Sequence, residues 1–308
     1  MINFVDFDAQ RFGETNIANV CVQRDFNRIT VPGEPHDALE KALSKFEDGI
    51  AEALRRVIEA RSPCDAETWN WVLNLMSNLA ARHPLVRADV ERKKDEWLRE
   101  ETKAAVRTPE AWADRAKQMI EDGFITAEQA QRPYEELKRF ADEGRYTISF
   151  THGHLTQLEF RTQDEILAAL GRRAWTILAS DGSDVRFIAT DRPACLLHKT
   201  GSFDPAVVPR TWDDRESIVL FPLSPGLVAH GVFEGASGAF HERPRVVPRD
   251  WVGRINVKVL QCTYTSIFAP ADQYLLGPDA LTAEQVLARV IGEPGRRKRG
   301  QSRLTNDG

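Results

Sequence analysis

The chain has 308 residues, of which 42% are hydrophobic and 28% are charged, and its formal net charge is −5 at pH 7. This composition excludes a wholly disordered chain, a collagen-like repeat and a small disulfide-stapled domain. The acidic balance also excludes a protein that coats nucleic acid along its whole length. The charge is uneven, because residues 293–308 carry +3 and the remaining 292 residues carry −8.

Several features bear on the compartment. Four widely spaced cysteines (Cys21, Cys64, Cys195 and Cys262) include no Cys-x-x-Cys pair, which in a chain of this length favours buried, reduced thiols over disulfides. Residues 1–12 lack the basic and then apolar pattern of a signal peptide, and no window approaches 18 uninterrupted apolar residues. We therefore expect a soluble cytoplasmic protein with no membrane partner.

The N-terminal third predicts short extended segments followed by helices. From residue 37 the apolar residues recur every three or four positions, which predicts a helix that ends at Ser62-Pro63. Asp65 is a suitable N-cap for a second helix. Proline lacks a backbone donor, so His83-Pro84 predicts a break or bend after that helix.

Residues 89–146 differ from the rest of the chain, because 27 of these 58 residues are charged. Thr108-Pro109 and a capping box that starts at Thr126 predict two helix starts. We expect exposed helices packed by a few apolar anchors; a disordered charged linker would lack these signals. The expected anchors are Trp97, Trp112, Ile120 and Phe140.

Short apolar runs separated by glycine and proline predict β-strands in the C-terminal half. The runs cover residues 175–179, 186–190, 217–221 and 228–232. The short link between the first two, around residues 180–184, predicts an antiparallel hairpin. Helical periodicity returns at Trp251, and a capping box at Thr282 predicts a terminal helix.

These elements together predict the α+β class, mainly helical, with a small antiparallel sheet in the C-terminal half. We expect a single domain over residues 1–270, with the charged helical stretch at 89–146 inside it. A terminal helix over 271–292 and a disordered basic tail over 293–308 would follow.

Five segments in a fixed order carry a family resemblance: 19–26 (NVCVQRDF), 80–87 (AARHPLVR), 186–193 (RFIATDRP), 218–225 (IVLFPLSP) and 254–256 (RIN). Together they resemble the bacterial domain of unknown function 4238 family over about residues 3–270. The family typically opens with a His-x-x-Pro segment that is absent before Asp6. Either the start codon is misplaced or this member has lost the segment, and in the second case a role held by that histidine in the family would be missing here. The resemblance implies no activity.

Asp191 is the first candidate for a catalytic residue, because it follows an apolar strand that would hold its side chain rigidly. A carboxylate there can ligate a divalent metal or act as a general base. The alternative is turn chemistry, in which Asp-x-Pro accepts nearby backbone N–H groups. Asn256 and Glu47 are two further catalytic candidates. Asn256 can orient a substrate or be a hydrogen-bonded core residue, and Glu47 can pair with Asp191 or lie on a solvated face.

Three residues are candidates for binding. Arg82 and Arg87 lie near a helix end, where two guanidinium groups can clamp a phosphate or carboxylate. Cations at that position are also favoured by the helix dipole without any ligand. Thr190 is the third, since it precedes Asp191.

No metal site is predicted. His152 and His154 would share a face only on a strand, and they have just Glu159 and Asp164 nearby as further ligands. The motifs of kinases, P-loop NTPases, zinc peptidases and common serine hydrolases are absent.

Two functions stay open. The first is a hydrolase-type or phosphate-handling enzyme centred on Asp191. The second is a non-catalytic interaction module that uses the charged helices and the basic tail. The sequence identifies no cofactor and no partner, and its only nucleic-acid signal is the basic run at 296–299.

Overall fold

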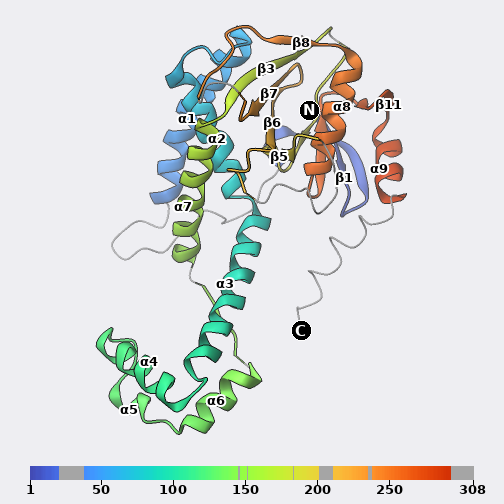
Figure 1. Cartoon of the computed structure of the whole chain (residues 1–308). Coiled ribbons are helices and arrows are strands. Elements are labelled where there is room, and N and C mark those ends of the chain that lie inside the picture. Colours follow the sequence, from blue (N-terminus) through green and yellow to red (C-terminus); the bar gives the residue numbers. More distant parts are fainter. Residues whose placement is uncertain are drawn as a thin grey trace. The chain divides into compact units, whose positions relative to one another are not determined.

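A computed structural model describes residues 1–20, 38–144, 146–150, 152–182, 184–200, 211–234 and 238–292. The chain divides into two compact units, and Figure 1 colours their helices and strands by position in the sequence. The first unit comprises residues 1–83 and 159–308, and the second comprises residues 84–158. The charged stretch at 89–146 therefore lies within the second unit. The basic tail lies outside the described residues.

All the described strands belong to the first unit and form three sheets. They are β1 (Ile2–Asp6), β2 (Arg11–Thr15), β3 (Ala174–Ser180), β4 (Ala189–Thr190), β5 (Cys195–His198), β6 (Ser217–Ser224), β7 (Leu227–Val232), β8 (Arg245–Val247), β9 (Ser266–Ala269), β10 (Tyr274–Leu276) and β11 (Asp279–Leu281). One sheet has the order β5-β6-β7-β3-β8 and a second has the order β2-β1-β9-β4, while β10 pairs with β11. Apart from the parallel pair β3–β8, the strand pairs are antiparallel, which confirms the α+β prediction.

The five-stranded sheet is the middle layer of the first unit. Its helices are α1 (Ala38–Ala60), α2 (Ala66–Ala81), the later turns of α7 (His152–Gly171), α8 (Arg249–Cys262) and α9 (Ala283–Gly292), with a 3-10 turn at Ile17–Asn19. Side chains alternate across a strand, so Trp175 and Ile177 of β3 pack with α1, α2 and α7, whereas Leu178 packs with α8 and α9. Figure 1 shows these helices on the two faces of the sheet.

The predicted hairpin around residues 180–184 is wrong. β3 pairs with β7 and β8, whereas β4 leaves this sheet and pairs with β9 in the four-stranded sheet. Asn256 gives the physical reason. Its side chain accepts from Ile188 N at 3.1 Å and donates to Arg186 O at 2.9 Å. Because these backbone groups are bonded to α8, they are not available to pair with β3.

Local start and stop signals in the first unit are confirmed. Asp65 caps α2 by accepting from Thr68 N at 2.8 Å, and α2 ends just before His83-Pro84. Thr282 and Gln285 form the predicted capping box of α9, with hydrogen bonds of 3.3 and 2.9 Å. Residues 271–282, which were predicted as part of this helix, instead contain β10 and β11.

The second unit contains α3 (Pro84–Ala105), α4 (Pro109–Glu121), α5 (Ala127–Ala130), α6 (Tyr134–Glu143) and the first residues of α7. The caps predicted at Thr108 and Thr126 are both present. Many charges pair along their own helix: Arg92, for example, bonds Asp89 and Glu96, each at 2.6 Å.

Three of the four predicted anchors of these helices are wrong. Trp97, Ile120 and Phe140 are exposed, while Trp112 is half-buried. The buried apolar positions are held by smaller residues, Val106, Ala116 and Ala141. Such side chains let helices approach closely and leave the large ones outside. In the described part of the chain, no helix combines the length and apolar character needed to cross a membrane.

Candidate functional site

One edge of the four-stranded sheet gathers residues from three distant parts of the chain. β1 and β4 end at this edge and β9 begins there, because β9 pairs antiparallel with both. Beyond the strands, Phe7 N donates to Thr265 O at 2.8 Å and Asp191 N donates to Ser266 O at 3.1 Å. Residues 6–8, 190–192 and 264–266 therefore lie side by side, and this set is the edge site.

The Asp191 carboxylate at this edge accepts four hydrogen bonds. Oδ1 accepts from Tyr264 N at 3.0 Å. Oδ2 accepts from Thr265 N and Thr265 Oγ1, each at 2.7 Å, and from Ser266 N at 3.2 Å. The donors lie 73 to 75 positions further along the chain. The carboxylate therefore accepts hydrogen bonds from backbone N–H groups, as the turn alternative predicts. These donors belong to the start of β9 and not to the turn that contains Asp191.

His83 is buried beside this carboxylate. Its ring packs edge-to-face on Tyr264, with the centroids 5.8 Å apart and the planes at 85°. Burial lowers the pKa of His83, the Asp191 carboxylate raises it, and the Arg192 guanidinium lowers it again, with a net decrease. The imidazole is thus neutral at pH 7, and it lies within electrostatic reach of both residues.

Arg192 adds a cation to the edge site. Its backbone N donates to Thr190 Oγ1 at 2.7 Å, which fixes the turn after β4. The side chain is half-buried, and within the described ranges its guanidinium has no hydrogen-bond or ion-pair partner. Arg82 differs, since its Nε lies 3.9 Å from Glu159 Oε2 in a pair whose side chains are 12% and 6% exposed.

Acidic residues lie on the β1 side of the edge. Burial raises the pKa of Asp8, and repulsion from the carboxylates of Asp6 and Asp191 raises it further. Asp6 accepts from Ala9 N at 3.0 Å and from Arg11 Nε at 3.4 Å. The described residues contain no group of three or more histidine, cysteine or acidic side chains arranged to hold a metal ion.

The structure brings some of the sequence candidates together. Asp191 and Thr190 share one turn, and Arg82 directly precedes His83. Asn256 is fully buried, and besides its bonds to residues 186–188 it donates to Leu275 O at 2.9 Å, so its polar atoms hold the fold. Glu47 is exposed on α1, and no contact of the described residues joins it to the edge site. Arg87 lies on α3 in the second unit.

Sequence reasoning missed Arg192, Tyr264 and Asp8. The only available signal for Arg192 was its position next to Asp191. Tyr264 and Asp8 had none, because their neighbours depend on strand pairing between distant residues. In the second unit, His154 lies 3.1 Å from Lys94 Nζ and stacks on Phe150. The His152 side chain lies outside the described residues.

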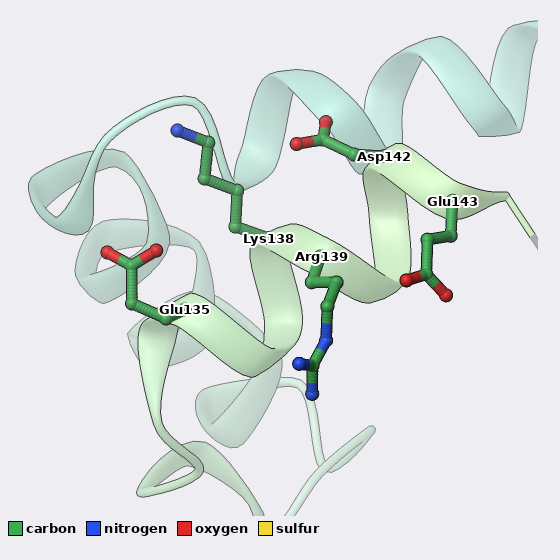
Figure 2. A pocket seen from close by; sticks show the side chains of 5 residues that line it. All are labelled: Glu135, Lys138, Arg139, Asp142 and Glu143. Atoms are coloured by element: carbon green, nitrogen blue, oxygen red, sulfur yellow. The ribbon is translucent and has the colours of Figure 1, made fainter.

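A hollow of about 380 Å³ lies on α6 in the second unit and contains none of these candidates. It is lined by Glu135, Lys138, Arg139, Asp142 and Glu143. Figure 2 shows that Lys138 and Arg139 project to opposite sides of the helix, so these side chains do not converge on one point. Three acids and two bases that are interspersed along one helix are typical of a solvated face.

Comparison with known proteins identifies a family. The sequence model of the family described as "Protein of unknown function (DUF4238)" matches residues 1–273, and the chain belongs to this family. Neither the search of curated proteins nor the search of solved structures found a match.

Proposed function

We propose that this member of the DUF4238 family is a hydrolase-type enzyme that binds a phosphate group of its substrate at the edge site. In this proposal Arg192 binds the phosphate, His83 is the general base and Asp191 is a positioning residue. One observation carries the proposal: a half-buried guanidinium without a partner among the described residues lies beside a histidine that burial keeps neutral.

Arg192 suits an anionic ligand for two reasons. A guanidinium presents a planar fork of donors that matches the oxygens of a phosphate or carboxylate. A partly buried cation without an ion-pair partner is also unfavourable, so a bound anion would compensate it. The hydrogen bond from Arg192 N to Thr190 Oγ1 already fixes the backbone from which this side chain extends.

His83 suits proton transfer because its lowered pKa leaves the imidazole neutral and able to accept a proton from water at pH 7. The Asp191 carboxylate favours the protonated form that results. Its oxygens already accept four hydrogen bonds, so Asp191 acts by holding Tyr264, on which His83 packs, and not by attacking the substrate.

Phosphate binding and turnover test this assignment separately. Isothermal titration with inorganic phosphate, and hydrolysis of p-nitrophenyl phosphate, would be measured on the wild type, Arg192→Ala and His83→Gln. Arg192→Ala is expected to weaken phosphate binding at least about tenfold, since a charge-assisted bidentate pair contributes more than ~1.4 kcal/mol. His83→Gln is expected to bind phosphate but to lose turnover.

Arg249→Ala is the matched control, because this arginine is exposed on α8 away from the edge site, and it should behave as wild type. The proposal fails if the wild type binds neither phosphate nor the ester, or if Arg192→Ala and Arg249→Ala bind phosphate equally well.

Cys64, Cys195 and Cys262 are free thiols, which supports action in the reducing cytoplasm.

The non-catalytic interaction module is the second candidate. The observation in its favour is that Trp97, Phe124 and Phe140 of the second unit are 58%, 75% and 52% exposed. Exposed aromatic side chains are typical of protein-binding surfaces. The charged side chains of α3 give weaker support to an interaction module than these aromatic side chains do, because many of the charges form ion pairs within their own helix.

A further inference from the structure

Two cysteines flank the two chain segments that build the edge site. Cys195 is the first residue of β5 and follows Arg192 by three positions. Cys262 is the last residue of α8 and precedes Tyr264 by two positions. One cysteine therefore belongs to the segment that carries Asp191, and the other to the segment whose backbone bonds Asp191.

The two cysteines lie on adjoining elements of one core. α8 packs against β5, and Cys262 packs against the core cluster that contains Cys195. The Cys262 thiol is the strongest influence on the pKa of the Cys195 thiol, which places the two side chains next to each other, and the Cys195 thiol donates to Arg192 O at 3.7 Å. Cys195 is fully buried, whereas Cys262 is partly exposed and so can be reached by a small oxidant.

We propose that Cys195 and Cys262 are a modification site that a peroxide oxidises to a disulfide. The Cys262 sulfur first attacks the peroxide, which gives a sulfenic acid and, from hydrogen peroxide, one water. The Cys195 sulfur then attacks the Cys262 sulfur and expels a second water. The two thiols together lose two protons and two electrons, which reduce the peroxide to two waters.

The disulfide would add a covalent link between segments that are otherwise joined at this edge by hydrogen bonds to Asp191. It would fix Arg192 relative to Tyr264, and it would close a long loop of chain between β5 and α8. The neighbouring Cys262 thiol, together with burial, raises the pKa of the Cys195 thiol. The second step is therefore expected to be faster at pH 8.5 than at pH 7, because the attacking species is the thiolate.

Peroxide treatment of the whole protein tests this inference. After hydrogen peroxide, alkylation of the remaining thiols and peptide mass spectrometry, we expect a Cys195–Cys262 cross-linked peptide that is two hydrogens lighter than the reduced pair. The oxidised protein should have a higher Tm, and dithiothreitol should restore both the thiols and the original Tm.

Cys262→Ser and Cys64→Ser form the matched comparison. Cys262 is only partly buried, so the serine is tolerated, and the Tm of this variant without peroxide confirms that it folds. It should show no cross-linked peptide and no rise in Tm. Cys64 lies in the loop before α2 with no thiol neighbour among the described residues, so Cys64→Ser should oxidise as wild type does.

The inference is overturned if both Cys195 and Cys262 remain open to alkylation in unfolded samples taken after peroxide treatment. A cross-link from Cys262 to Cys21 or Cys64 would overturn it equally. The mass measurement on wild type needs no variant, and it does not depend on whether the edge site binds phosphate.

Discussion

The Asp191 carboxylate stabilises the fold through its hydrogen bonds to residues 264–266. Asp191→Ala would leave three backbone N–H groups and one hydroxyl without this acceptor. We expect it to lower the free energy of unfolding by about 2–4 kcal/mol, since hydrogen bonds to charged groups are worth more than neutral ones. Asp191→Asn should cost less, because the amide oxygen still accepts. Urea unfolding at pH 7 measures both values.

Asp181→Ala is the control for this prediction, because that aspartate is exposed in the turn after β3 and should change the stability by less than about 0.5 kcal/mol. An Asp191→Ala protein as stable as Asp181→Ala would show that the carboxylate does not hold β9.

The sequence predicts Asp191 and Thr190 as site residues because they end an apolar strand. It does not predict the donors to Asp191, since these come from a segment more than seventy residues away.

α8 depends on one close approach to a neighbouring turn. A Cβ atom on Gly253 would lie 1.8 Å from the backbone oxygen of Gly277, and Gly277 N donates to Gly253 O at 2.9 Å. Gly253→Ala would favour the isolated helix by about 1 kcal/mol, but here it forces two backbones apart. We therefore expect Gly253→Ala to lower the free energy of unfolding by about 3 kcal/mol or more, measured by urea unfolding.

Gly171→Ala, at the end of α7, is the matched variant because its added Cβ meets nothing within 4 Å. It should stay within about 1 kcal/mol of wild type. Equal effects of the two variants would refute the close approach. Helix starts such as Asp65 and Thr126 could be predicted because a cap acts within four residues. The contact of Gly253 with Gly277 could not, because it joins two elements.

The stability of the whole molecule is expected to depend on pH through His230 of β7. Burial and then, in decreasing order, the positive charges of Lys258, Arg245 and Arg173 together lower the pKa of His230 from 6.5 to about 4. The unfolded chain therefore binds a proton below pH 6.5 before the folded chain does. His230 therefore leaves the free energy of unfolding unchanged above about pH 6.5 and lowers it as the pH falls toward about 4, by about 2 kcal/mol at pH 5.

Urea unfolding at pH 7.5 and pH 5 measures this effect, and His230→Gln should remove that share of the pH dependence because glutamine does not titrate. His83, whose pKa is also lowered, contributes in the same direction and stays in both proteins. An unchanged pH dependence in His230→Gln would contradict the prediction. The three cations come from α8, from β8 and from the residue before β3, so only the folded molecule places them around this histidine.

The sequence by itself determined the features that depend on interactions within a few residues. Apolar periodicity, caps and the His83-Pro84 break were enough for α1, α2, the helices after Thr108 and Thr126, and the α+β class. Only the tertiary structure decided the pairing of β4 with β9, the four donors to Asp191 and the neutral state of His83. These properties depend on burial and on partners far along the chain. Because hydrogen bonding and desolvation depend on distance in space, no local pattern of residues encodes them.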